Sequence, residues 1–181
     1  MMRQVMLTVG LLAAAALVLD AQGPAPASKL LVATGKEILQ IVNPGILICE
    51  GGQPTGVPAP MCSPSTKRIH VRNAIAEATY QDVTGTAAAL VGGRATIITQ
   101  CNLDDKYFGF CWGTWEWAAP GQAGKWEGAW SSTTDYAAGV GAISSELCGY
   151  GGKLEGLQMK YASVYPGGMS PATFVVRVMS Q

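Results

Sequence analysis

The sequence is poor in charge and contains a single histidine. Only 13% of its 181 residues are charged, and 12 lysines and arginines balance 12 aspartates and glutamates. Without an excess of positive charge the chain cannot neutralise a phosphate backbone, so we expect no nucleic-acid partner. The five cysteines lack the closely spaced pairs of structural zinc sites, and His70 is the only histidine, which disfavours a zinc centre. No phosphate loop, dinucleotide fingerprint or G-x-S-x-G elbow occurs, and we expect no cofactor.

Long apolar runs are missing after the first twenty residues. Arg3 precedes an apolar stretch over residues 5–19, and Ala21 follows as a small residue, an order typical of a cleaved export signal. The stretch is shorter than the roughly 20 residues of a bilayer span, although an uncleaved membrane anchor is the alternative. The sequence therefore predicts a signal peptide over 1–21, a flexible Pro-Ala-rich tether over 22–28 and one domain over 29–181. We expect a secreted or periplasmic protein with no membrane span in the mature chain.

Glycine and strand-forming residues, by contrast, are abundant. The chain has 23 glycines, and Glu, Lys and Arg are sparse beside Val, Ile and Thr. Short apolar or alternating runs are separated by turn residues, which is typical of an antiparallel sandwich or barrel. The segments 35–42 and 73–81 also fit short helices. The expected strands are residues 30–33, 37–42, 46–49, 68–73, 76–80, 85–90, 94–100, 108–117, 125–131, 139–145, 157–164 and 173–179.

Export would place the cysteines in an oxidising compartment, where disulfides persist. Five cysteines allow two disulfides and one free thiol, in several arrangements that the sequence alone does not separate. Proximity favours Cys49 with Cys62, across a Pro-Gly loop, and Cys101 with Cys111, across a hairpin. Cys148 is then the free thiol.

All five tryptophans lie within residues 110–132. If the loop 118–124 joins two antiparallel strands so that Trp117 faces Trp126, Trp115 opposes Gly128 and Trp130 opposes a glycine too. Large rings then lie over glycines of the neighbouring strand. The rings that share this face are Trp115, Trp117, Trp126 and Trp130.

The same register places charged residues on the opposite face, where Glu116 opposes Glu127 beside Lys125. Three interpretations follow: a buried aromatic core with solvated charges outside, a ligand cavity or sugar-stacking platform lined by the rings, or a glycosidase in which Glu116 and Glu127 are acid and base about 5–9 Å apart. An open sheet face lacks the buried setting of a general acid, which disfavours the third. The expected ligand-binding residues are Trp115, Trp117, Trp126, Trp130 and Tyr161.

His70 alternates with Arg68 and Arg72, so the three basic side chains would share one face of a strand. They could form an anion site. A solvated edge strand is the simpler explanation.

A glycine-rich order of strands in the C-terminal half carries a family resemblance. A Trp-x-Gly-x-Trp strand at residues 126–130 precedes a small-residue strand with Gly139 and Gly141, and the run Gly-Lys-Leu-Glu-Gly-Leu follows at 152–157. Over residues 112–165 this order resembles the closing strands of allene oxide cyclase-like and dirigent-like β-barrels. The resemblance implies an eight-stranded barrel whose apolar interior binds a small hydrophobic molecule, or steers its cyclisation or coupling without a cofactor. No motif here places the family's catalytic glutamate or steering aspartate, and the loop between Cys49 and Cys62 departs from its plant members.

The sequence therefore predicts an all-β protein: a single antiparallel β-barrel of about eight strands with short loops and two disulfides, preceded by a signal segment. We expect noncatalytic binding of a small apolar or sugar ligand. A cofactor-free cyclase or isomerase is the first alternative, and a cavity lined by Trp115, Trp126 and Tyr161 with a buried carboxylate would favour it. The second is a structural or cell-surface interaction protein, because open sheet edges and low net charge favour self-association.

Overall fold

The computed structural model describes residues 29–55, 61–118, 121, 123–167 and 171–180. The predicted signal peptide and tether lie outside this range. The described chain contains eleven strands and two 3-10 helices. The strands are β1 (Leu31–Asn43), β2 (Ile46–Glu50), β3 (Pro54–Thr55), β4 (Met61–Cys62), β5 (Arg68–Gly85), β6 (Gly93–Asp104), β7 (Phe108–Ala118), β8 (Lys125–Asp135), β9 (Val140–Tyr150), β10 (Leu157–Pro166) and β11 (Ala172–Ser180), and the helices are η1 (Ala88–Leu90) and η2 (Gly152–Leu154).

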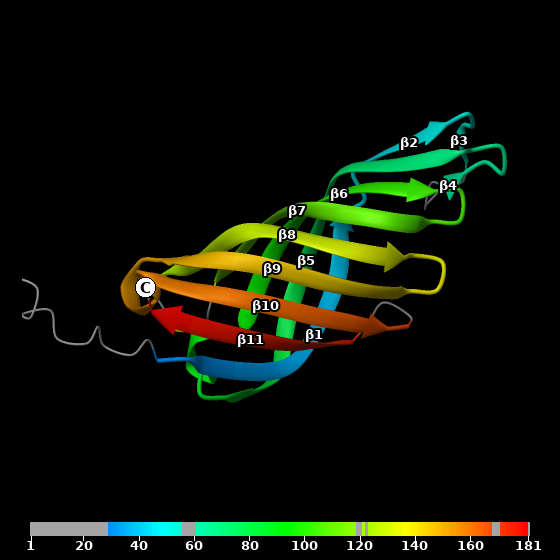
Figure 1. Cartoon of the computed structure of the whole chain (residues 1–181). Helices are drawn as coiled ribbons and strands as arrows, with labels where there is room; N and C mark the ends of the chain where they lie inside the picture. The colour runs from blue at the N-terminus through cyan, green and yellow to red at the C-terminus, as the bar shows by residue number, and fades with distance from the viewer. Residues whose placement is uncertain (1–28, 56–60, 119–120, 122, 168–170, 181) are drawn as a thin grey trace, which may run out of the picture.

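Eight of the strands form a closed antiparallel barrel (Figure 1). From β5 to β11 each long strand pairs with the next one along the chain, and β1 pairs with both β11 and β5, which closes the sheet. The predicted all-β barrel is thereby confirmed, and the sandwich is excluded. Closure removes the open edges that a flat sheet would expose.

Two differences from the expected strands have a physical reason. The two strands expected at 30–33 and 37–42 form one long strand, β1, and those expected at 68–73 and 76–80 form another, β5. The helical alternatives for 35–42 and 73–81 are therefore wrong. On β5, the buried residues Ala76, Ala78 and Tyr80 alternate with more exposed residues. Every second side chain lies on the same face of a strand, but not of a helix, so this alternation gives one buried face only in a strand. The strand expected at 85–90 is instead the end of β5, a turn and η1, where the chain crosses the barrel end.

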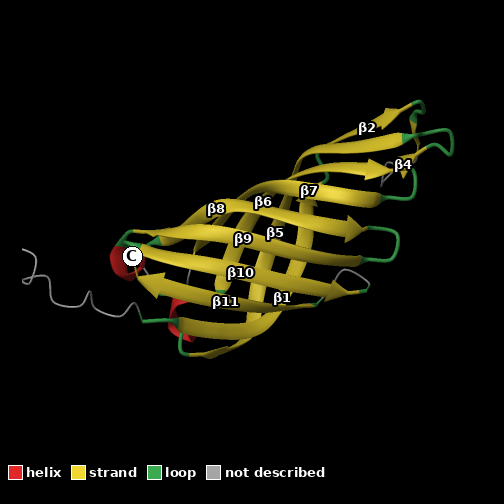
Figure 2. Ribbon diagram, in the orientation of Figure 1, coloured by secondary structure: helices red, strands yellow, loops and turns green. Residues whose placement is uncertain are grey.

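The two 3-10 helices lie at the same end of the barrel, which we call the closed end (Figure 2). Leu154 of η2 is fully buried, and two tryptophan rings anchor the segment around η1. Trp117 Nε1 donates a hydrogen bond to the Gly92 carbonyl oxygen at 2.7 Å, and Trp126 Nε1 donates one to that of Leu90 at 2.9 Å. The buried indole N–H groups of Trp117 and Trp126 are thus both paired.

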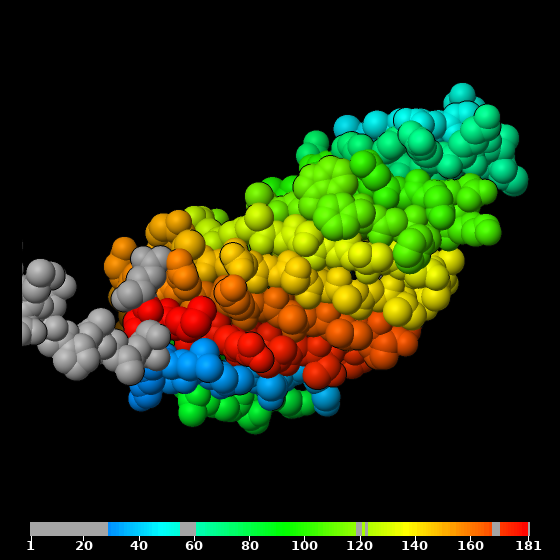
Figure 3. Space-filling view, in the orientation of Figure 1, coloured from blue at the N-terminus to red at the C-terminus, as the bar shows by residue number. Residues whose placement is uncertain are grey.

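An extension, which we call the arm, projects beyond the other end of the barrel (Figures 1 and 3). It consists of β2, β3, β4 and the adjoining ends of β5, β6 and β7, residues 68–73, 100–104 and 108–112. β1 and β2 pair in turn with β5, and Pro44 and Gly45 lie between them. At the same level β5 has an irregular register around Asn73, whose φ is 55°. A Cβ at Gly45 would overlap the Arg72 carbonyl oxygen, so the close contact at this bend requires glycine.

Both predicted disulfides are present, and both lie in the arm. Cys49 on β2 is bonded to Cys62 on β4, and Cys101 on β6 is bonded to Cys111, its direct neighbour on β7. Cys148 is a free, exposed thiol, as expected. The two disulfides are compatible with a secreted protein or another oxidising environment.

Candidate functional site

The predicted pairing of the tryptophan strands is confirmed. Trp117 faces Trp126, Trp115 faces Gly128, and Gly113 faces Trp130 between β7 and β8. These four rings point into the barrel, where they are at least 93% buried, so they do not form an exposed sugar-stacking platform. The residues around them are also aromatic.

Trp115 and Trp117 pack tightly against tyrosines of other strands. Tyr80 stacks on Trp117 with ring centroids 4.0 Å apart, and Tyr161 meets Trp115 edge to face at 4.6 Å. Such contacts are favourable beyond the area that they bury. The interior near the closed end is therefore a packed aromatic core, as the first interpretation proposed.

The two candidate catalytic glutamates lie on the outside of the barrel. Glu116 and Glu127 face each other across β7 and β8, as expected, and Lys125 forms an ion pair with both. The Lys125 ammonium beside Glu127 lowers the pKa of that carboxyl below its ordinary value. A general acid requires the opposite shift. This exposed pair has the properties of solvated charges.

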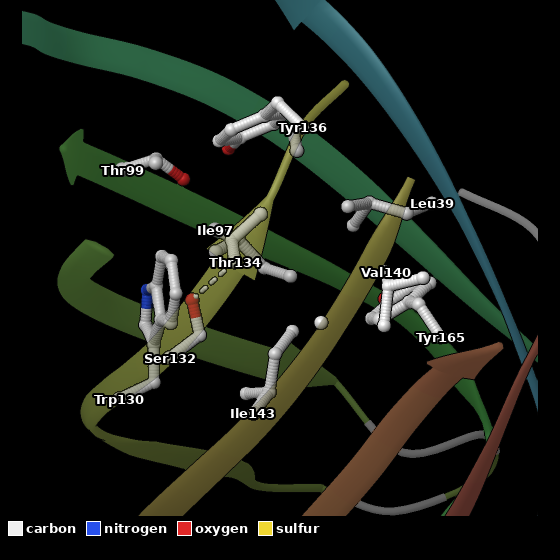
Figure 4. A pocket seen from close by; sticks show the side chains of 12 residues that line it. Leu39, Ile97, Thr99, Trp130, Ser132, Thr134, Tyr136, Val140, Ile143 and Tyr165 are labelled. Atoms are coloured by element: carbon white, nitrogen blue, oxygen red, sulfur yellow. Dashed lines mark hydrogen bonds between the residues drawn. The ribbon is translucent and has the colours of Figure 1, made fainter. Parts of the chain in front are cut away.

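A small cavity lies at the end of the barrel beside the arm. Figure 4 shows the side chains that line it. The cavity has a volume of about 50 Å³, and we call it the mouth cavity. Trp130, one of the five predicted ligand-binding residues, forms part of its wall, and Ser132 and Thr134 share a hydrogen bond of 3.0 Å on that side (Figure 4). The residues that line it are Leu39, Ala76, Ile97, Thr99, Trp130, Ser132, Thr134, Tyr136, Val140, Gly141, Ile143 and Tyr165.

A larger apolar groove lies between the inner face of the arm and the barrel mouth. It encloses about 480 Å³, and we call it the arm groove. It shares four residues with the mouth cavity, so the two hollows adjoin one another. The shared residues are Leu39, Ala76, Thr99 and Tyr136; the others that line the arm groove are Ile41, Pro44, Gly45, Leu47, Ile69, Val71, Ala74, Ile75, Leu103 and Tyr107.

Tyrosines and a disulfide hold the walls of the arm groove together. Tyr107 OH accepts a hydrogen bond of 3.2 Å from the Cys62 backbone N–H. The Tyr107 carbonyl oxygen accepts one of 3.1 Å from the Tyr136 backbone N–H. The Tyr136 hydroxyl lies 3.6 Å from Cys101 Sγ and 3.8 Å from Cys111 Sγ. The arm is therefore fixed over the mouth by groups that also line the groove.

A buried carboxyl group lies deeper in the barrel, behind the mouth cavity. Glu37 on β1 is fully buried, and Tyr165 OH donates a hydrogen bond to its Oε2 at 2.6 Å. Its Oε1 has no hydrogen-bond partner in the described part of the chain. Burial raises the pKa of Glu37 above its ordinary value, and the hydroxyls of Tyr165, Tyr161, Ser163 and Tyr80 only partly oppose this.

Tyr165 connects this carboxyl to the mouth cavity, because its side chain lines the cavity and binds Glu37. Sequence reasoning missed the pair, and it placed Tyr161 in a site without its neighbour Glu37. One signal was present: Glu37 is the charged member of the inward series Ala33, Gly35, Glu37 and Leu39. A charge at an inward position of a strand is rare unless it is paired or functional.

The basic residues around His70 form a polar network on the outer face of the arm. His70 contacts Glu50 Oε1 at 2.7 Å and Asn102 Oδ1 at 2.8 Å. Arg72 donates to Asn102 at 2.7 Å and lies over the ring of Trp112. The expectation of an edge strand is wrong, since β5 lies between β2 and β6 here. The side chains of His70 and Arg72 already have partners within the protein.

Comparisons with protein-family models, with curated proteins and with solved structures gave no significant match to this chain. The resemblance to allene oxide cyclase-like and dirigent-like barrels thus stays a prediction. Among the described residues no helix is long and apolar enough to cross a bilayer, and no group of three metal-binding side chains occurs. What defines the candidate site is its geometry: a barrel with one closed end, and at the other end an apolar groove beside a small cavity whose wall includes several hydroxyls.

Proposed function

We propose that the protein is a secreted or periplasmic binding protein that holds a small apolar molecule, without catalysis, in the arm groove and mouth cavity. The observation that carries the proposal is the arm groove itself. Its volume of about 480 Å³ is within the range of roughly 300–1,000 Å³ that small-molecule sites occupy, and its lining is mostly apolar.

Exposed apolar residues in the groove support the proposal. Ile41 lines the groove and is 55% exposed. Contiguous apolar surface that a folded protein leaves open often marks a binding site. A ligand that covers Ile41, Leu47 and Val71 would remove this surface from water, at roughly 25 cal/mol per Å² buried.

Fluorescence titration with the uncharged dye nile red tests the proposal. We expect saturable binding with a blue-shifted emission, weakened at least about fivefold by Ile41→Gln because a polar amide replaces part of the apolar wall. Ile46→Gln is the matched control: Ile46 is 60% exposed and does not line the groove. Absence of saturable binding, or an equal effect of both substitutions, would contradict a binding site in the arm groove.

The buried carboxyl favours a second candidate function, a cofactor-free isomerase or cyclase. Glu37 has a raised pKa and shares a hydrogen bond with Tyr165, which faces the mouth cavity, so the pair could pass a proton to a bound molecule. Resemblance to allene oxide cyclase-like barrels supports the same idea. For such an enzyme we expected a cavity lined by Trp115, Trp126 and Tyr161. None of the three lines the mouth cavity, whereas Tyr165 does.

An isomerase converts its ligand to a product of equal mass. Molecules that co-purify with the protein from an exporting host can be extracted and incubated with fresh wild-type protein or Glu37→Gln. A new chromatographic peak of unchanged mass with the wild type alone would establish the reaction. Unaltered ligand with both proteins would leave binding as the function.

A further inference from the structure

We propose that the ligand of the arm groove is uncharged, with a hydroxyl or carbonyl group at the end that enters the mouth cavity and a hydrocarbon body that lies along the arm. This inference rests on the proposed binding function, and it adds the chemical class and the direction of the ligand. Three features of the site carry it.

The first feature is the position of the hydroxyl-bearing side chains. In the outer part of the arm groove the side chains are hydrocarbon, from Ile41, Leu47, Ile69, Val71 and Leu103. In the mouth cavity the hydroxyls of Thr99, Ser132, Thr134 and Tyr165 are added. Tyr107 and Tyr136 also bring hydroxyls to the arm groove, but the Tyr107 hydroxyl already accepts a hydrogen bond from the Cys62 backbone N–H. A hydrogen-bonding group of a ligand therefore finds more hydroxyl partners at the inner end, whereas a hydrocarbon chain fits the outer part.

The second feature is the size of the inner end. The mouth cavity measures about 50 Å³, which is room for only a few water-sized groups. A hydroxyl, an aldehyde or a ketone group fits this space. A sugar ring or a phosphate ester does not, so the inner end selects a compact head group.

The third feature is the charge of the walls. No described residue that lines the mouth cavity or the arm groove is charged. The Arg72 guanidinium is engaged elsewhere, because it donates to the Cys101 carbonyl oxygen at 2.6 Å and lies over the Trp112 ring. A carboxylate or phosphate that entered the site would lose its hydration without gaining a cation, and burial of an unpaired ion is costly.

A cationic head group is disfavoured as well. The ionisable group behind the cavity is Glu37, and its carboxyl is turned toward Tyr165, which donates to it at 2.6 Å. Glu37 does not itself line the cavity, so an ammonium group there gains no direct ion pair, and burial also disfavours the charged form of this carboxyl. The site therefore favours an uncharged head group over both an anion and a cation.

Competition among three ligands with the same chain tests the inference. Decanol, decanoate and decylammonium share a ten-carbon chain and differ in the charge of the head, so each is used to displace bound nile red at neutral pH. We expect decanol to bind at least about tenfold more tightly than either ion. Equal binding of the three, tighter binding of an ion, or failure of decanol to displace the dye would overturn the inference. Saturable binding of nile red would still support the proposed function in each of these cases. Absence of nile red binding would overturn both.

Two variants test the direction of the ligand. Thr134→Val removes a hydroxyl of the mouth cavity at nearly constant volume, and should weaken decanol at least about threefold more than it weakens nile red. Thr114→Val, on the outer face of β7, is the matched control. Thr99→Lys adds a cation where cavity and groove meet, and should raise the affinity for decanoate relative to decanol. An unchanged ratio in Thr99→Lys, with nile red still bound, would contradict the placement of the head group.

Discussion

Replacing the buried Glu37 by glutamine should abolish a loss of stability that the wild-type protein undergoes as the pH rises. Glu37 is fully buried, and burial raises its pKa above the ordinary value of 4.5. A glutamine side chain is of nearly equal size, and its carbonyl oxygen can still accept the hydrogen bond from Tyr165. The two proteins therefore differ mainly in whether this group titrates.

The sign of the effect follows from the two protonation states. Below pH 4.5 the carboxyl is protonated in both folded and unfolded wild-type chains, and its contribution to stability is fully present. As the pH rises above this value the unfolded chain ionises Glu37 while the folded chain keeps the proton. The free energy of unfolding then falls by at most about 1.4 kcal/mol per pH unit, until the folded protein also releases the proton.

The neighbours of Glu37 do not titrate in this window. Burial raises the pKa of Tyr80, Tyr161 and Tyr165 further above their ordinary value of 10.0, so these hydroxyls remain neutral. Carboxyls elsewhere in the chain affect both proteins alike, and their contributions cancel in the difference between wild type and variant.

Urea denaturation of the unreduced proteins, at several values between about pH 4 and about pH 8, measures the difference. We expect Glu37→Gln to gain stability relative to the wild type as the pH rises through the lower part of this range. Parallel curves for the two proteins would refute the raised pKa. A wild type that becomes relatively more stable with rising pH would show that Glu37 is stabilised as a carboxylate, the reverse of our reasoning.

Three further predictions concern the framework around the site. Replacing Cys49 and Cys62 together by Ser should lower the free energy of unfolding by about 3 kcal/mol, because the bond links positions 13 apart in sequence; a loss below about 1 kcal/mol in urea would contradict this. Gly128→Ala should cost at least about 2 kcal/mol, because the added Cβ would overlap the Glu146 carbonyl oxygen, and an unchanged melting temperature would disprove the crowding. Iodoacetamide should label Cys148 alone in the native, unreduced protein, and a second labelled cysteine would contradict the disulfides.

Local patterns made part of the fold predictable. The pairing of Trp117 with Trp126 follows from a short loop and from the alternation of rings with glycines, and both predicted disulfides join cysteines at most 13 positions apart. In each case the information lies within one hairpin or loop. Neighbouring segments suffice to specify such features.

Contacts between distant segments were not predictable in the same way. Glu37 and Tyr165 are 128 positions apart and meet only because the barrel closes through β1. The arm depends on Pro44, Gly45 and the irregularity at Asn73 lying at one level of two paired strands. The sequence 85–90 is compatible with a strand, and its 3-10 turn arises where the chain covers the barrel end. Tertiary structure decides all three.

Side-chain volume along a single strand explains why the site lies at the arm end of the barrel. On β8 the inward residues run from Trp126 at the closed end, through Gly128 and Trp130, to Ser132 and Thr134 at the mouth. Large rings fill one end and hydroxyl-bearing side chains leave space at the other, since a close-packed interior has room only where small residues face one another. The same run that makes the tryptophans a core therefore places the open volume, and its polar wall, beneath the apolar arm.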